Sequence, residues 1–220
     1  MFNRSGLAAL CAAASVCLGA FEQNAAQAQV SSAGSRPAIW TGFYAGVHAG
    51  GGKVFTDDSD IGNSIDGFIV GGHAGYNFQS GMMIYGIEGD YTRSQMDASF
   101  TDNSNPFAGP INIKAEVNYL ASIRGRIGTA VTDTAMLYGT LGYAWSEVTV
   151  TGTAPLLGQT ESISASVDGI VAGGGLEYKL SENTSARLEG LYYWLGTDGP
   201  SNDSPIGTIR AGLTLHLPPN

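Results

Sequence analysis

Two acidic residues near the middle of the chain have the types and spacing for acid–base chemistry. Glu88 and Asp90 stand one residue apart in the segment YGIEGDY, and paired carboxylates can act as general acid and base. Other segments carry charges at the same alternating positions, with nearly balanced signs, which favours a buried network of ion pairs over catalysis. The residues predicted to form this network are Glu88, Asp90, Lys114, Glu116, Arg124, Arg126, Glu177, Lys179, Arg187, Glu189 and Arg210.

The histidines are the other candidates for chemistry. His48, His73 and His216 are widely separated in the chain, which argues against a metal or haem site, although a haem site at His48 and His73 remains an alternative. No serine stands out beside His216 as a nucleophile. We therefore expect polar roles for all three, with no catalytic residue, no metal site, no cofactor and no enzymatic activity.

Glu88 and Asp90 must be positioned by the surrounding segment, residues 67–91, which has the pattern of a β-hairpin. Its apolar residues recur at every second position on both sides of a short break at Gln79, Ser80 and Gly81. Such alternation predicts two strands with one apolar face, joined by a tight turn, with Glu88 and Asp90 on the opposite face. The apolar positions are Phe68, Val70, Ala74, Tyr76, Phe78, Met83, Tyr85, Ile87 and Tyr91.

The same alternation occurs in eight segments of the chain. They span residues 40–52, 67–78, 83–91, 111–128, 135–148, 167–180, 185–196 and 206–217. The connections are alternately long and short; the long ones, near residues 53–65, 95–110, 149–162 and 197–205, are predicted to be polar loops. This rhythm predicts an all-β fold, an eight-stranded antiparallel up-and-down barrel with long loops at one end and both termini at the other.

The N-terminus has the features of a secretory signal peptide. A basic start is followed by an apolar run over residues 7–21 and an A-x-A site, which predicts cleavage after Ala28. The apolar run is too short for a stable membrane anchor, the alternative. Cys11 and Cys17 lie in this segment, so that the mature chain would contain no disulfide. We expect a signal peptide at 1–28, a flexible periplasmic lead-in at 29–38 and a barrel domain at 39–220.

Composition favours a membrane barrel over a soluble one. Charged residues make up 13% of the chain, against about 25% in soluble domains, and no apolar run after the signal has the roughly 20 residues of a membrane helix. A soluble lipocalin-like barrel is the alternative. Aromatic residues near the strand ends favour interfacial girdles at a membrane. These are Trp40, Tyr76, Tyr91, Tyr143, Trp145, Tyr192 and Trp194.

Several motifs together resemble a known family. WTGFYAGVHAGGG, GGHAGYNF, YGIEGDY, SIRGRIG, LYGTLGYAW, GGGLEYKL and GTIRAGLTLHL resemble the porin-family β-barrels of alphaproteobacteria, the outer-membrane immunogenic proteins, which are similar in fold to the OmpA transmembrane domain and to opacity proteins. The resemblance implies a place in the Gram-negative outer membrane, contact with lipid and lipopolysaccharide, and insertion by the assembly machinery. Such barrels usually end on an aromatic residue, whereas this chain ends its last strand at Leu217.

The resemblance and the charge pattern together predict a structural role. We expect a barrel plugged by its ion-pair network, which supports envelope integrity and presents acidic surface loops; a narrow diffusion pore is the main alternative. Divalent cations could link the loop carboxylates to lipopolysaccharide phosphates. The loop acids are Asp57, Asp58, Asp60, Asp97, Asp102, Glu161, Asp198 and Asp203. The net charge of −9 excludes nucleic acid as a partner.

Overall fold

The computed structural model describes residues 39–55, 66–102, 111–154, 159–197, 199 and 205–217. The predicted signal peptide at 1–28 and lead-in at 29–38 lie outside these residues. So do the loop acids at 57, 58, 60, 198 and 203 and the last three residues of the chain, and the side chain of Asp102 is not described either. The loop acids that remain are Asp97 and Glu161.

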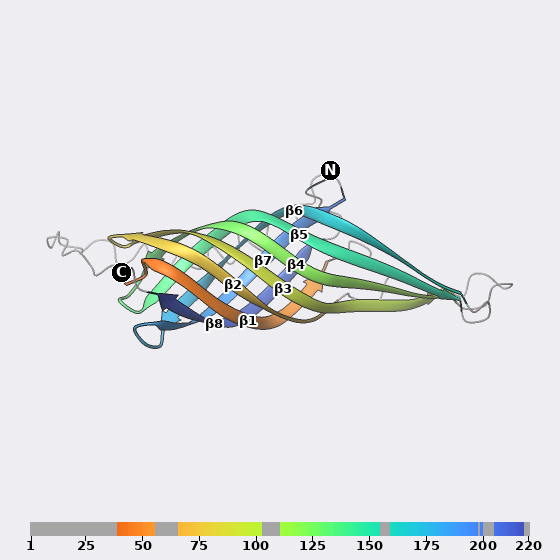
Figure 1. Cartoon of the computed structure of the whole chain (residues 1–220), viewed down its shortest axis with the longest axis horizontal. Coiled ribbons are helices and arrows are strands. Elements are labelled where there is room, and N and C mark those ends of the chain that lie inside the picture. Colours follow the sequence, from red (N-terminus) through yellow and green to blue (C-terminus); the bar gives the residue numbers. More distant parts are fainter. Residues whose placement is uncertain are drawn as a thin grey trace, which may run out of the picture. The chain divides into compact units, whose positions relative to one another are not determined.

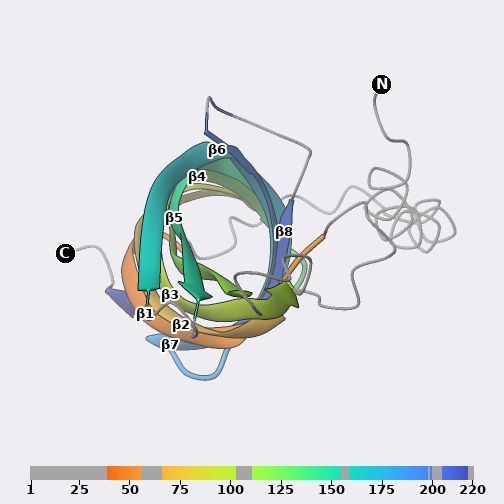
Figure 2. The same ribbon diagram turned by 90° about the vertical axis from the view of Figure 1, so that its right-hand side faces the viewer.

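The described chain forms eight antiparallel strands in one closed ring, which confirms the predicted fold class. Each strand pairs with its neighbours in sequence, and β1 closes the ring by pairing with β8 (Figures 1 and 2). Among the described residues, no helix is long and apolar enough to cross a membrane. The strands are β1 (Gly42–Val54), β2 (Asp66–Ser80), β3 (Met83–Asp102), β4 (Ile111–Ala130), β5 (Ala135–Ala154), β6 (Gln159–Lys179), β7 (Thr184–Gly196) and β8 (Ile206–Leu217).

The two faces of the barrel wall differ in the way that a membrane requires. On β8, for example, Ile209 is 69% exposed on the outside whereas its neighbour Arg210 is 2% exposed in the lumen. Apolar side chains cover the outside all round the ring, and polar or charged ones are buried within. A soluble lipocalin-like barrel has the reverse arrangement, because water surrounds it. The structure therefore favours the membrane barrel.

Four strands are much longer than the sequence pattern suggested. β3, β4, β5 and β6 have 20, 20, 20 and 21 residues, whereas the other strands have 12 to 15. Most of the extra residues belong to segments 95–110 and 149–162, which were predicted to be loops; that prediction was wrong for residues 95–102, 149–154 and 159–162. They form a four-stranded sheet that projects beyond the ring (Figure 1). We call this part the extension.

A β-bulge separates the two parts of β4. Its pairing with β5 skips Asn118, and its pairing with β3 shifts at the same level. An extra residue in one strand reverses the side on which the following side chains project. On the far side of the bulge Val117 therefore joins the interior, while Lys114 and Glu116 pair with positions on the outer face of β3.

Candidate functional site

The middle of the lumen holds four carboxylates and four guanidinium groups. β3 contributes Glu88 and Asp90, β4 Arg124 and Arg126, β6 Glu177, β7 Arg187 and Glu189, and β8 Arg210. All eight are nearly inaccessible to solvent. The four negative and four positive charges balance, as buried charges must if they are to remain ionised.

Ion pairs cross the full width of the barrel. Glu88 accepts two hydrogen bonds from Arg187, at 2.7 and 3.1 Å, and another from Arg124. β3 and β7 lie four strands apart in a ring of eight, so this bidentate pair joins opposite walls. Paired parallel bonds of this kind are among the strongest that a guanidinium group makes. The hydroxyl of Tyr44 donates to Glu88 as well, at 3.0 Å.

The second centre of the network is Glu189. Its carboxylate accepts from Arg187 at 2.8 Å, from Arg210 Nε at 2.7 Å and from the Tyr138 hydroxyl at 3.0 Å. Arg210 also donates to Asp90 at 3.0 Å. Each of these acids therefore contacts more than one base, and the removal of any one member leaves the buried network with an unbalanced charge.

A smaller group of polar residues lies towards the short turns. Arg126 donates to Glu177, and its guanidinium carbon lies 3.6 Å from the centre of the Tyr138 ring. Glu177 also accepts from Ser185 at 2.5 Å and lies 3.1 Å from His216 Nε2. A cation above an aromatic ring is stabilised by the electrons of the ring, so Arg126 has favourable contacts on two sides.

Ser185, His216 and Glu177 together superficially resemble a catalytic triad, which the sequence analysis missed. Ser185 Oγ and Glu177 Oε1 both contact the same ring nitrogen of His216, at 2.8 and 3.1 Å. In a catalytic triad the acid and the nucleophile contact different nitrogens of the imidazole ring. Ser185 is also completely buried. The arrangement therefore lacks the geometry of nucleophilic catalysis.

Three of the predicted network residues do not join the central group. Lys114 and Glu116 lie on the outer face of the extension, beyond the bulge, where Lys114 donates to Glu116 at 2.8 Å and lies 3.8 Å from Asp97. Their placement in the lumen was wrong, because the bulge reverses the alternation on which it rested. Lys179 does point inwards, but it donates to the Glu182 carbonyl at 2.9 Å and lies above the Trp40 ring.

His48 and His73 form a stacked pair in the lumen, with their ring centres 5.6 Å apart. The hydrogen bonds around the pair fit two neutral rings, except that the Arg210 guanidinium also lies 3.3 Å from His48 Nε2. Thr92 donates to Asp90 at 3.1 Å, so its oxygen accepts from His48 Nε2 at 2.8 Å. His48 Nδ1 is then the acceptor for His73 Nδ1, at 3.3 Å, and Thr214 donates to His73 Nε2 at 3.0 Å. Two neutral imidazoles in opposite tautomers satisfy this chain.

Glycines make room for the large lumenal side chains. Tyr44 faces Gly75 on β2, and Tyr138 faces Gly175 on β6. A Cβ atom at Gly75 would lie 2.5 Å from the Tyr44 hydroxyl, and one at Gly175 would lie 2.6 Å from that of Tyr138. Such distances are far below van der Waals contact. The high glycine content of the inward positions thus allows the rings to cross a narrow lumen.

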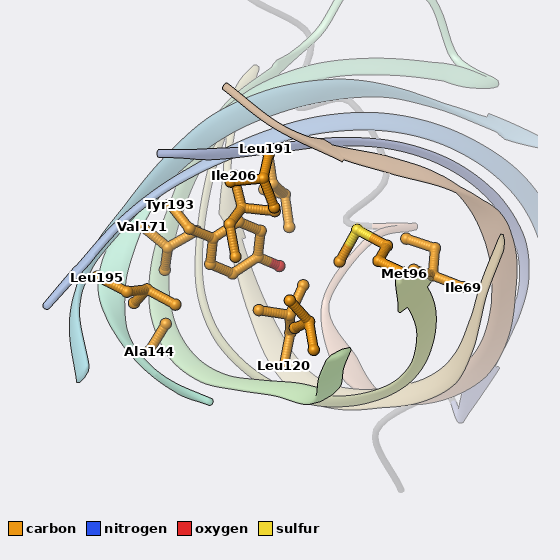
Figure 3. Close-up of a cluster of buried hydrophobic side chains, with 11 residues drawn as sticks. Ile69, Met96, Leu120, Ala144, Val171, Leu191, Tyr193, Leu195 and Ile206 are labelled. Carbon is orange, nitrogen blue, oxygen red and sulfur yellow. The ribbon is translucent and has the colours of Figure 1, made fainter. Parts of the chain in front are cut away.

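Apolar layers lie on both sides of the charged network, a feature that the sequence analysis missed. On the side of the extension, inward residues from many strands pack together (Figure 3). On the side of the short turns, five further buried residues form a smaller cluster. The larger cluster comprises Val54, Ile69, Met96, Val117, Leu120, Ala144, Val171, Leu191, Tyr193, Leu195 and Ile206, and the smaller one comprises Trp40, Ile84, Ala130, Met136 and Tyr138.

Six of the seven aromatic residues assigned to the girdle lie on the outer surface. Tyr143 contacts Trp145 and Tyr192 contacts Trp194, with ring centres 5.4 and 4.8 Å apart. Tyr76 and Tyr91 also face outwards, each against another aromatic ring. The exception is Trp40, which is 1% exposed and points inwards against His216. Its placement in the girdle was wrong, because Trp40 lies in the turn before β1, where its ring packs against His216 and the Lys179 ammonium group.

No part of this arrangement forms an evident metal site. Within the described ranges, no group of three or more His, Cys, Asp or Glu side chains could hold a metal ion. The buried carboxylates are occupied by arginines, and the ring nitrogens of His48 and His73 have hydrogen-bond partners.

A closed β-ring with an apolar exterior, a buried polar interior and aromatic residues on its outer surface defines the class of outer-membrane β-barrel proteins. Comparison with known proteins identifies the family. The family described as "Outer membrane protein beta-barrel domain" matches residues 8–216. The chain belongs to this family, and the protein is therefore located in the outer membrane of a Gram-negative bacterium.

Named relatives agree with the family resemblance seen in the sequence. The chain is 31% identical over 202 residues to the "31 kDa outer-membrane immunogenic protein" of Brucella melitensis. This alignment covers 79% of the chain and 82% of the relative. It is 32% identical over 181 residues to the "22 kDa outer membrane protein" of Rhizobium leguminosarum bv. viciae, and this alignment covers 81% of the chain and 72% of the relative. Among solved structures, it is similar to Ail of Yersinia pestis, with a TM-score of 0.49, 18% identity and coverage of 80% and 99%.

Proposed function

We propose that the protein is a structural component of the outer membrane and that its lumen is closed. The observation that carries this proposal is the bidentate pair between Glu88 and Arg187, which joins opposite walls of the barrel. It lies in a balanced network with apolar layers on both sides. An ion entering the lumen would have to cross two apolar layers and displace ion pairs that satisfy one another.

Planar-bilayer recording tests the closed lumen against the main alternative, a narrow diffusion pore. The purified, refolded protein is expected to give silence or rare, brief openings, because conduction requires the network to rearrange. Steady ohmic steps would overturn the proposal. The double variant Glu88→Gln/Arg187→Gln removes the charges of the cross-lumen pair and is the matched test; more frequent openings in this variant would identify the network as the barrier.

The outer surface of the extension supports a second part of the proposal. Above the aromatic residues, the carboxylates of Asp97 and Glu147 lie on the outer face, where lipopolysaccharide sugars and phosphates would surround the barrel. Divalent cations that prefer oxygen ligands would link such carboxylates to lipid phosphates. A melting temperature in lipopolysaccharide-containing vesicles that rises with magnesium supports this role, and one that ignores both magnesium and calcium argues against it.

Neither haem binding nor catalysis is part of this function. A haem iron would need a free ring nitrogen, whereas those of His48 and His73 are already bonded inside the barrel. The Ser185–His216–Glu177 group has both partners on one nitrogen of the imidazole ring. A haem titration compares the wild type with the variants His48→Gln and His73→Gln. If the wild type binds haem and both variants bind it more weakly, the conclusion that these histidines do not bind haem would be overturned.

A further inference from the structure

Two histidines lie beside the ion-pair network in the lumen. His48 and His73 are 3% and 4% exposed, and each ring lies over a glycine of the neighbouring strand. His73 is paired with Gly46, and His48 is paired with Gly71. A Cβ atom at Gly46 would lie 2.6 Å from His73 Nε2, and one at Gly71 would lie 2.7 Å from His48 Nε2. The two strands thus fit closely around a pair of side chains whose type ordinarily gains its charge between about pH 8 and pH 5.

The hydrogen bonds of this pair can accommodate one more proton. In the neutral pair, His73 Nδ1 donates to His48 Nδ1 at 3.3 Å, and Thr214 donates to His73 Nε2 at 3.0 Å. If a proton binds to His73 Nε2, this nitrogen becomes the donor and the Thr214 hydroxyl turns to accept. The proton on His73 Nδ1 can then move to His48 Nδ1, so that the two rings share the positive charge. No hydrogen bond is lost, because His48 Nε2 continues to donate to Thr92 at 2.8 Å.

The added charge would lie against an arginine. Arg210 Nη1 is 3.3 Å from His48 Nε2, and the same nitrogen donates to Asp90 at 3.0 Å. The Thr92 hydroxyl also donates to Asp90, at 3.1 Å, and so joins His48 to this carboxylate. A protonated pair therefore repels Arg210 and competes with it for Asp90. The titratable and charged groups that face the pair are Tyr44 on β1, Glu88 and Asp90 on β3, Arg187 and Glu189 on β7, and Arg210 on β8.

The network is already balanced before such a proton binds. Its four carboxylates match its four guanidinium groups, and Asp90 contacts Arg124 at 3.2 Å as well as Arg210. A fifth positive charge among these buried groups is costly, because no further carboxylate of the network offsets it. The bond between Arg210 and Asp90 lies nearest to the new charge and links β8 to β3 across the lumen. That bond is therefore the first to weaken.

We propose that the histidine pair is an acid sensor of the lumen: it binds one proton as the pH falls, the new charge loosens the bond between Arg210 and Asp90, and the lumen opens more often. This inference rests on the proposed closed lumen and adds its regulation. His216 provides a contrast within the same barrel. Its Nε2 atom lies 3.1 Å from Glu177 Oε1, so a proton there strengthens an attraction. Protonation of the pair and protonation of His216 thus have opposite effects on their neighbours.

Planar-bilayer recording at two pH values tests the sensor. The purified, refolded full-length protein is expected to open at least about tenfold more often at about pH 4.5 than at about pH 7.5, because close like charges repel by more than the energy of a tenfold change. The double variant His48→Gln/His73→Gln keeps polar side chains that cannot gain a charge, and it should lose this response. The matched control His216→Gln should retain it. Heat-modifiability on gels verifies that both variants are folded.

The outcomes separate the sensor from the closed lumen. Silence of the wild type at both pH values would overturn the sensor and leave the closed lumen intact. Steady ohmic steps at both pH values would overturn the closed lumen and the sensor with it. An acid response that persists in the double variant would also overturn the sensor, because protonation of the carboxylates would then explain the openings.

A spectroscopic measurement follows the proton in the wild type itself. Nitrogen NMR of the protein with isotope-labelled histidine, in lipid nanodiscs, distinguishes protonated from unprotonated ring nitrogens. We expect His48 and His73 to be neutral and in opposite tautomers at about pH 7.5, and to share one added proton at about pH 4.5. The signals of His216 are assigned by their loss in His216→Gln. Two rings that stay neutral at the lower pH would overturn the sensor, whatever the conductance.

Discussion

The barrel and its extension use the same alternation of side chains in opposite ways. Where lipid surrounds the strands, Leu141 and Ile170 face outwards and the charges are inside; in the extension, Thr149 and Ser164 face outwards and bond to each other at 2.9 Å. The inner row of the extension carries Val148 and Val167, packed against the larger apolar cluster. The solvent outside each region thus decides which face is apolar, and the strands continue through the change.

The largest expected difference between the two regions is the loss of stability when one carboxylate of an ion pair is removed. Glu88→Leu leaves Arg124 and Arg187 buried without their carboxylate, and should lower the free energy of unfolding by about 3–5 kcal/mol. Urea unfolding in lipid vesicles, followed by tryptophan fluorescence, measures it. The control is Glu116→Leu in the extension, whose exposed pair with Lys114 should contribute far less. Equal losses in the two variants would contradict the contrast between barrel and extension.

The boundary between lipid and water can be located on a single strand. Leu141→Arg places a charge on the lipid-facing side of β5 and should cost about 2–4 kcal/mol if the residue lies near the middle of the bilayer. Thr149→Arg, on the same face of the same strand beyond Trp145, should be nearly neutral. The same unfolding assay compares them. A large cost at Thr149 would place the membrane higher on the barrel than the aromatic residues indicate.

Packing density is the next difference. A methyl group at Gly175 would lie 2.5 Å from the Leu188 carbonyl oxygen and 2.6 Å from the Tyr138 hydroxyl, whereas one at Gly152 in the extension would meet no atom within 4 Å. Gly175→Ala should therefore cost about 1–3 kcal/mol, as overpacking does, and Gly152→Ala less than about 0.5 kcal/mol. Melting temperatures in detergent test the pair. An unchanged melting temperature in Gly175→Ala would show that the neighbouring lumenal groups shift to make room for the methyl group.

The smallest effect is expected at Lys114. Its hydrogen bond to Glu116 raises the pKa of this exposed lysine. A raised pKa means that the pair stabilises the fold below the ordinary lysine pKa and that this contribution disappears as the pH rises through the folded-state value. Lys114→Met should remove that pH dependence and shift stability only slightly, less still in high salt. A salt-independent effect would show that the pair is shielded from solvent.

Much of the fold could be predicted from the sequence, because a barrel wall between lipid and a polar lumen forces a period of two. The eight strands and both faces of the hairpin that holds Glu88 followed from that period. The outer ends of β3 to β6 did not follow from it, because Ser, Thr and charged residues on the outer face are not typical of a strand that faces lipid. Thr149 and Thr151 bond across to Ser164 and Ser162 as strand residues.

The candidate site was predictable only in part, for the same reason. Alternation placed most of the charged residues on the inward faces of their strands, and closure of the ring then brings them together. These residues are Glu88, Asp90, Arg124, Arg126, Arg187, Glu189 and Arg210. It failed for Lys114 and Glu116, because a bulge is a local change in pairing that leaves no periodic signal. The lumen prediction also missed Leu120 and Val171, because it rested on charged residues and these inward positions are apolar.

The sequence by itself thus determined the class of fold, the membrane-facing surface and the balance of charge. Only the tertiary structure decided which acid meets which base. That choice depends on closure of the ring, which sets Glu88 of β3 opposite Arg187 of β7 although 99 positions separate them. Periodicity is a local property of one strand, whereas partners across a lumen depend on the register of every strand between them.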